Sequence, residues 1–80
     1  MLMPGKIYNR VEELLARRKR DNPELPTSYR NIGEALDMSP TTVGAWMNNT
    51  IKRYDSEKMA AWCDFLDCDL SDLLVYEREE

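Results

Sequence analysis

The stretch that decides the fold runs from residue 29 to residue 47 and reads Tyr29-Arg30-Asn31-Ile32-Gly33-Glu34-Ala35-Leu36-Asp37-Met38-Ser39-Pro40-Thr41-Thr42-Val43-Gly44-Ala45-Trp46-Met47. Ile32 and Leu36 recur at helical spacing in its first half, and Val43 and Trp46 do so in its second half. Two short helices joined by a few residues cross at a steep angle, and Gly33 leaves room for that crossing. The stretch therefore predicts a helix-turn-helix.

Both helices carry start and stop signals. Ser28 is a typical N-cap, and the helix that follows it extends to about residue 36. Ser39 is the N-cap of the second helix, with Pro40 at the first helical position, where a missing N–H costs nothing. We expect this helix to reach Asn48 and Asn49 to end it, because Asn tolerates left-handed backbone well.

Three further helices are expected around this motif. The first runs from Lys6 to Arg20, the fourth starts at an N-cap at Asp55, and a short fifth starts at Asp69. The fold class is therefore all-α, a compact five-helix bundle in a single domain of residues 1–80. Its core spans about residues 6–76, and residues 77–80 form a charged tail.

The charge of the chain is unevenly distributed along its length. The net charge is −4, but residues 1–53 carry 9 basic and 6 acidic side chains, whereas residues 54–80 carry 2 basic and 9 acidic ones. The first part can therefore approach phosphate while the second stays away from it. No stretch is long and apolar enough to cross a membrane, and the first residues lack the apolar run of a signal peptide, so we expect a cytoplasmic protein.

The residues that would support catalysis or a bound metal or cofactor are missing. The chain has no histidine, no nucleophile beside a base and no glycine-rich phosphate loop, so we expect neither an enzyme nor a bound cofactor. Cys63 and Cys68 lie at apolar positions of the helical pattern with no second pair beside them, which favours structural thiols over a metal site. Two cysteines in so small a chain also fit a reducing compartment.

The segment from Val43 to Asn48 and the segment from Met59 to Leu74 resemble the lambda-repressor-like family of helix-turn-helix proteins, which includes the Cro and XRE-type regulators. The resemblance extends from about Tyr8 to Tyr76. It implies a compact bundle of five helices in which the third enters the major groove of DNA. The chain departs from the family pattern at three positions, with Gly33 for the usual Ala, Asp37 for the usual Gly and Gly44 for a common small hydroxyl residue.

The resemblance also implies which residues contact DNA. The exposed start of the third helix would read bases, and the matching positions here are Pro40, Thr41, Thr42 and Ala45. Thr hydroxyls can bond base edges, and methyl groups can contact thymine, so we expect modest discrimination. The set expected to contact phosphates comprises Ser28, Tyr29, Arg30, Asn48, Lys52 and Arg53. The basic run from Arg17 to Arg20 would add attraction at longer range.

These features predict a sequence-preferring regulator of transcription, a repressor that binds double-stranded DNA as a homodimer. Its half-sites would lie about 34 Å apart. The residues expected at the dimer interface are Leu70, Leu73, Leu74, Val75 and Tyr76, with Ile7 and Tyr8 as further candidates.

Two interpretations remain beside this one. Val75 and Tyr76 have strand character and would pair with the N-terminal segment. A protein-interaction module, such as an antitoxin-like protein or an adaptor, is the alternative function, with the acidic C-terminal half facing a basic partner.

Overall fold

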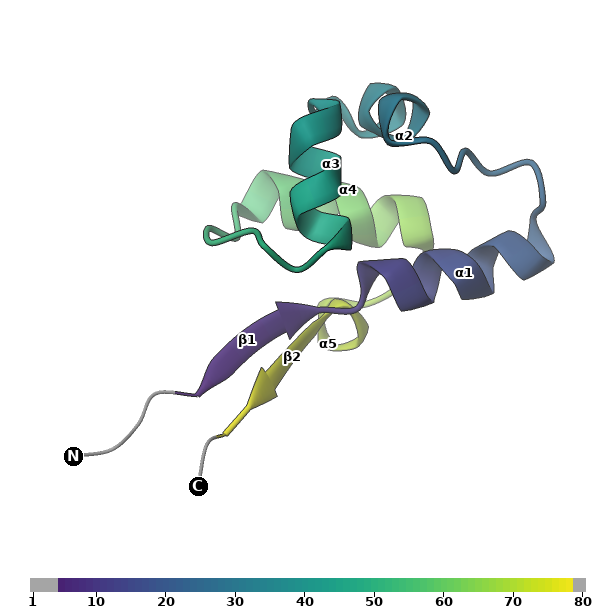
Figure 1. The fold of residues 1–80 in the computed structure, drawn as a ribbon. Helices are drawn as coiled ribbons and strands as arrows, with labels where there is room; N and C mark the ends of the chain where they lie inside the picture. The colour runs from purple at the N-terminus through teal and green to yellow at the C-terminus, as the bar shows by residue number, and fades with distance from the viewer. Residues whose placement is uncertain (1–4, 79–80) are drawn as a thin grey trace.

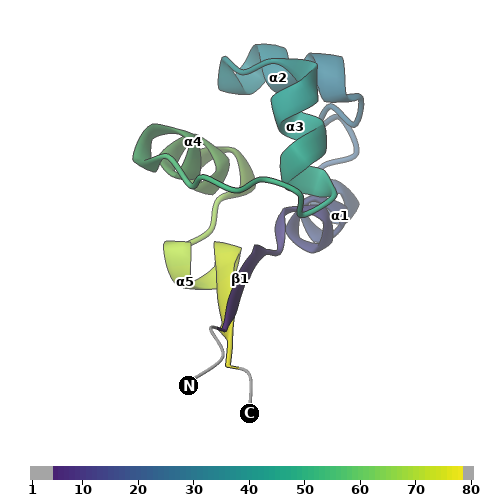
Figure 2. The same ribbon diagram turned by 60° about the vertical axis from the view of Figure 1, so that its left-hand side comes forward.

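Two helices, α2 (Tyr29–Leu36) and α3 (Pro40–Met47), form the predicted helix-turn-helix in the computed structural model, which describes residues 5–78. Figures 1 and 2 show α2 at one end of the molecule and a two-stranded sheet projecting at the other. The remaining elements are β1 (Lys6–Asn9), α1 (Val11–Asp21), α4 (Ser56–Leu66), α5 (Leu70–Leu73) and β2 (Leu74–Glu77).

The sheet corrects two expectations, the all-α class and the helix that was to begin at Lys6. Strands β1 and β2 pair in antiparallel fashion, with Ile7 opposite Tyr76 and Tyr8 opposite Val75. Helix α1 therefore begins only at Val11. The physical reason is that the backbone of residues 6–9 finds its hydrogen-bond partners in a distant strand, and β-branched and aromatic side chains suit that surface. The expected pairing of Val75 and Tyr76 with the N-terminal segment is confirmed.

The predicted helix caps are confirmed. The Oγ atom of Ser28 accepts a hydrogen bond from the N–H of Asn31 at 3.1 Å, and the Oγ of Ser39 accepts one from Thr42 at 3.1 Å. Asp55 caps α4 in the same way, and Asp69 stands at the N-cap of α5. Each cap satisfies a backbone donor that the helix itself leaves unpaired, which fixes where the helix begins.

The core lies where α1, α2, α3 and α4 meet. Trp46 of α3 and Trp62 of α4 are both fully buried, and their ring centroids are 5.8 Å apart. Tyr54, in the loop between these helices, packs edge-on against Trp46 at 5.2 Å. Burial of each large apolar side chain contributes about 1.5–3 kcal/mol, so this aromatic row holds α3 firmly against α4. The other fully buried large side chains are Val11, Ile32, Val43 and Leu73.

The start of α1 is held by an ion pair. The Arg10 Nε donates to the Glu13 Oε2 at 2.8 Å, and this hydrogen bond lowers the pKa of the Glu13 carboxyl.

At the other end of the chain, Glu77 belongs to β2, so the expected charged tail begins one residue later than predicted. The last two residues of that tail, 79 and 80, lie outside the described residues, as do residues 1–4. Across residues 5–78, no helix is long and apolar enough to cross a membrane.

Candidate nucleic-acid interface

The turn between α2 and α3 has the close approach that the sequence predicts. A Cβ atom at Gly33 would run into the backbone carbonyl oxygen of Met38. The N–H of Met38 in turn donates to the carbonyl of Gly33 at 2.9 Å. Asp37 takes the left-handed conformation at the end of α2, with a φ of 56°. A glycine and a residue tolerant of positive φ together allow the steep crossing of the two helices.

Helix α3 has one buried side and one exposed side. Val43 and Trp46 have no exposed surface, and they attach the helix to the core. Pro40 and Thr41 are exposed at its first turn, and Thr42 and Ala45 are half-buried beside them. The residues expected to read bases thus share the outward side of one helix, with Thr42 and Ala45 less accessible than the other two.

The two threonines of this surface differ in how their hydroxyls are used. The Thr42 Oγ1 lies 2.9 Å from the Oγ of Ser39, so it shares in the N-cap of α3. The Thr41 hydroxyl has no hydrogen-bond partner within residues 5–78. Thr41 is therefore the better placed of the two to bond a group outside the protein.

The start of α2 presents the first part of the expected phosphate-binding set. Ser28, Tyr29 and Arg30 are all exposed there. The Arg30 Nε lies 3.7 Å from the Glu34 Oε1, and both side chains are largely exposed. An exposed ion pair of this kind contributes little, so Arg30 can leave Glu34 for a phosphate at small cost.

The loop after α3 presents the second part of that set. Asn48, Lys52 and Arg53 are exposed in the segment that joins α3 to α4. In Figures 1 and 2 this segment and the start of α2 lie on opposite sides of α3. The potential phosphate contacts therefore flank the helix that carries the potential base contacts, which suits a duplex whose two backbones border one groove.

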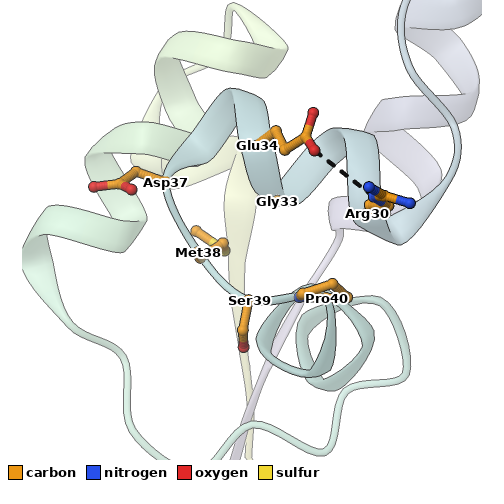
Figure 3. Close-up of a pocket in the computed structure, with 7 residues that line it drawn as sticks. All are labelled: Arg30, Gly33, Glu34, Asp37, Met38, Ser39 and Pro40. Carbon is orange, nitrogen blue, oxygen red and sulfur yellow. Dashed lines mark ion pairs between the residues drawn. The ribbon is translucent and has the colours of Figure 1, made fainter.

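A hollow lies at the turn itself, on the outer side of the helix-turn-helix. Figure 3 shows its lining residues, with the Arg30–Glu34 pair along α2 and Ser39 and Pro40 at the start of α3. Its polar and apolar lining residues come from α2, the turn and the start of α3, so the hollow adjoins the exposed surfaces at the starts of both helices. The residues that line it are Arg30, Gly33, Glu34, Asp37, Met38, Ser39 and Pro40.

Two side chains of the basic run at the end of α1, Arg17 and Lys19, have oxygen partners within the protein. The Lys19 Nζ donates to the carbonyl of Leu25 at 3.1 Å, and Arg17 lies 4.0 Å from Glu13. Arg17 and Arg18 also line a hollow together with three acidic side chains. These neighbours reduce the charge that the run can offer to DNA. The acidic residues of that hollow are Asp21, Asp67 and Asp72.

Comparison with known families agrees with this geometry. A family model described as the Cro/C1-type HTH DNA-binding domain matches residues 10–79, which include both helices of the motif and the flanking loop. The chain belongs to this family. The resemblance seen in the sequence is thereby confirmed, and the Cro/C1-type chain is a DNA-binding domain of a normally non-enzymatic family. No curated protein and no solved structure matched the chain.

Two contacts of this Cro/C1-type domain were not anticipated from its sequence. The Tyr29 ring lies over Gly44, where a Cβ atom would come within 3.2 Å of the Tyr29 Cε2. The side chain of Asn49 bonds the backbone of Asn9, 40 residues earlier. A missing side chain at Gly44 is a signal for the first contact, but nothing local in the sequence indicates the second.

The residues expected at a dimer interface are divided between core and surface. Leu73 is fully buried within the protomer, so it presents nothing to a second copy. Leu70 and Tyr76 are 50% and 59% exposed, and Leu74 and Val75 are half-buried. Of the two further candidates, Ile7 is 56% and Tyr8 36% exposed. In the part of the chain that the structure describes, no group of three or more acidic or cysteine side chains is arranged to hold a metal ion.

Proposed function

We propose that this Cro/C1-type chain is a sequence-preferring repressor in which α3 lies in the major groove. The observation that carries the proposal is the exposed first turn of α3, with Pro40 and Thr41 outward on a helix whose inner side is fixed by Val43 and Trp46. A helix held rigidly on its buried side presents its outer side chains in a defined geometry, as base reading requires. A protein bound across a promoter represses by occluding it.

The proposed repressor binds DNA as a homodimer, and the two protomers associate through their projecting sheets. Ile7 and Tyr76 are paired across the two strands, and each exposes more than half of its surface. A two-stranded sheet on its own is only marginally stable in water, and its outer edges carry unpaired backbone groups. A second copy would cover this apolar pair and give the two-fold symmetry of an operator.

The first test is the exchange of Thr41 for Ala, alone and together with Thr42→Ala. Duplexes selected from a random pool by the parent protein serve as the specific sites. We expect the double variant to lose on the order of tenfold in its preference for the selected site over random duplex, with Thr41→Ala responsible for most of the loss. Ser71→Ala, which removes an exposed hydroxyl from α5, is the matched control. An unchanged preference in the double variant would contradict base reading by α3.

A second candidate function rests on the acidic residues around the junction of α4 and α5. Asp64, Asp67, Asp69 and Asp72 line one hollow on this part of the molecule. A basic partner protein would be attracted there. Asp64→Lys separates the two functions, because the exposed Asp64 takes no part in capping or in backbone strain. If the protein is a repressor, Asp64→Lys should bind DNA as tightly as the parent or more tightly. If it is an interaction module, the variant should lose its partner protein, and the parent itself should not bind DNA.

A further inference from the structure

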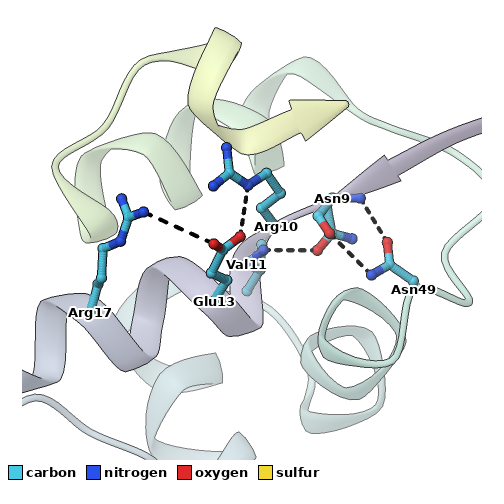
Figure 4. A network of polar contacts seen from close by, with 6 residues as sticks. All are labelled: Asn9, Arg10, Val11, Glu13, Arg17 and Asn49. Carbon is cyan, nitrogen blue, oxygen red and sulfur yellow. Dashed lines mark hydrogen bonds and ion pairs between the residues drawn. The ribbon is translucent and has the colours of Figure 1, made fainter. Parts of the chain in front are cut away.

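The end of the recognition helix is tied to the sheet by one side chain. Asn49 takes the left-handed conformation just after α3, with a φ of 57°. Its Oδ1 accepts a hydrogen bond from the backbone N–H of Asn9 at 2.7 Å, and its Nδ2 donates to the carbonyl of the same residue at 3.0 Å. Figure 4 shows the two bonds side by side. The amide of Asn49 thus pairs with Asn9 as a neighbouring strand would.

The two hydrogen bonds between the Asn49 side chain and the Asn9 backbone form a clamp, and this clamp joins three elements at one point. Asn9 is the last residue of β1, where it pairs with Leu74 of β2. Its own side chain accepts from the N–H of Val11 at 3.1 Å and so holds the start of α1. Within residues 5–78, every other side-chain hydrogen bond joins residues six or fewer positions apart. Among the described residues, the clamp is therefore the only place where a side chain forms hydrogen bonds between the end of α3 and the sheet.

The residue type at position 49 meets two demands at once. The left-handed backbone there favours Gly, Asn and Asp over the other residues. Of these three, Gly has no side chain, and the carboxylate of Asp has no hydrogen to donate to a carbonyl. Only Asn both adopts this backbone readily and bonds the N–H and the carbonyl of one residue. Two bonds to one residue fix the angle between the segments as well as their distance.

We infer that Asn49 is a positioning residue that sets the orientation of α3 relative to the sheet. The inference rests on the proposed function, in which the sheets of two protomers meet. In such a dimer the orientation of α3 against the sheet decides how far apart, and at what rotation, the two recognition helices reach the duplex. The clamp would then determine which half-site spacing the protein accepts. Asn49 itself need not contact a base for this effect.

The test measures affinity against the spacing between half-sites. The parent protein first selects its two-fold site, and the two half-sites are then moved apart or together by single base pairs. Each base pair rotates a half-site by roughly 35° about the duplex axis. We expect the parent to lose about tenfold or more for one base pair in either direction, and Asn49→Gly to lose less than about threefold. Asn49→Asp, which keeps only the acceptor, should resemble Asn49→Gly.

Asp67→Gly is the matched control for the backbone. Asp67 also takes a left-handed conformation at a helix end, with a φ of 52°, but lies at the end of α4 and is exposed. It should keep the spacing profile of the parent. All variants are measured at a temperature where each is folded, so a loss of stability alone leaves the profile sharp.

The possible outcomes separate the two proposals. A sharp parent profile that flattens only in the two Asn49 variants supports the clamp. A profile that stays equally sharp in Asn49→Gly overturns the positioning role and leaves Asn49 as a stabilising residue only. A parent that selects no two-fold site overturns the proposed function and with it this inference.

Discussion

Two glycines of the helix-turn-helix illustrate how a single atom decides what a position tolerates. Both lie inside helices, where Gly costs about 1 kcal/mol relative to Ala. At Gly33 the added Cβ would meet a backbone carbonyl, which has little freedom to move. At Gly44 it would lie 3.2 Å from the ring of Tyr29, an exposed side chain that can turn away. Substitution by Ala should therefore destabilise the protein at position 33 but not at position 44.

We expect Gly33→Ala to lower the free energy of unfolding by about 1–3 kcal/mol, because the clash exceeds the gain in helix propensity. Gly44→Ala should leave this free energy unchanged or raise it by up to about 1 kcal/mol. Urea unfolding followed by the fluorescence of the buried tryptophans measures both. A larger loss in Gly44→Ala than in Gly33→Ala would contradict the packing described for the turn.

The pKa of the Cys68 thiol, just after the end of α4, reports how far this side chain is buried in the folded protein. Burial raises its pKa from 9.0 to about 11, with a smaller contribution from the neighbouring Cys63. Because folding raises this pKa, the contribution of this thiol to stability is complete below pH 9 and is lost as the pH rises through about 11. The free energy of unfolding should therefore decline over that range.

The reactivity of Cys68 follows from the same shift, since the thiolate is the nucleophile. At pH 8.5 we expect iodoacetamide to modify Cys68 at least about tenfold more slowly in the folded protein than in the chain unfolded by urea. Peptide mapping by mass spectrometry distinguishes it from Cys63. Equal rates in the two states would show that the thiol is not shielded.

At the scale of elements, local signals predicted the helix-turn-helix well. Ser28 and Ser39 cap their helices as expected, and Asn49 has the left-handed backbone expected of a helix terminator. These signals act over three or four residues, so one sequence contains them completely. They cannot report what a side chain reaches elsewhere, and for that reason the bond from Asn49 to Asn9 was not foreseen.

The strand β1 shows the limit of local interpretation. Ile7 and Val11 are four residues apart, as on one side of a helix, and that spacing suggested a helix from Lys6. The backbone of residues 6–9 instead pairs with β2, at the other end of the described chain, and the helix begins only at Val11. Such a pairing depends on contacts that no local pattern contains, although the strand character of Val75 and Tyr76 indicated one half of it.

The exposed pair on the sheet leads to a prediction about assembly. Ile7→Ser combined with Tyr76→Ser should convert the proposed dimer to a monomer, because it removes the apolar surface that a second copy would cover. Sedimentation equilibrium of the parent and the variant measures this. Tyr29→Ser, which alters an exposed aromatic residue at the opposite end of the molecule, should leave the association constant unchanged. A parent that remains monomeric, or a double variant that still dimerises, would rule out the sheet as the interface.

At the scale of the whole molecule, charge and architecture agree. The helix-turn-helix and the loop after α3 lie in the part of the chain with a net positive charge, whereas residues 54–80 carry the acidic excess. Asp67, just after α4, and Asp72 of α5 line a hollow together with Arg17 and Arg18 of the basic run, which limits how much of that run can reach phosphate. Attraction to DNA should thus come chiefly from the residues that flank α3.

The most direct test is a fluorescence-anisotropy titration with duplex DNA over a series of salt concentrations. The log of the association constant should fall linearly with the log of the salt concentration, with a slope equivalent to several phosphates. Lys52→Ala should reduce that slope by about one, and selection from random duplexes should enrich a two-fold-symmetric site. If no duplex binds even at low salt, the surface around α3 does not bind DNA, and the chain is not the repressor proposed above.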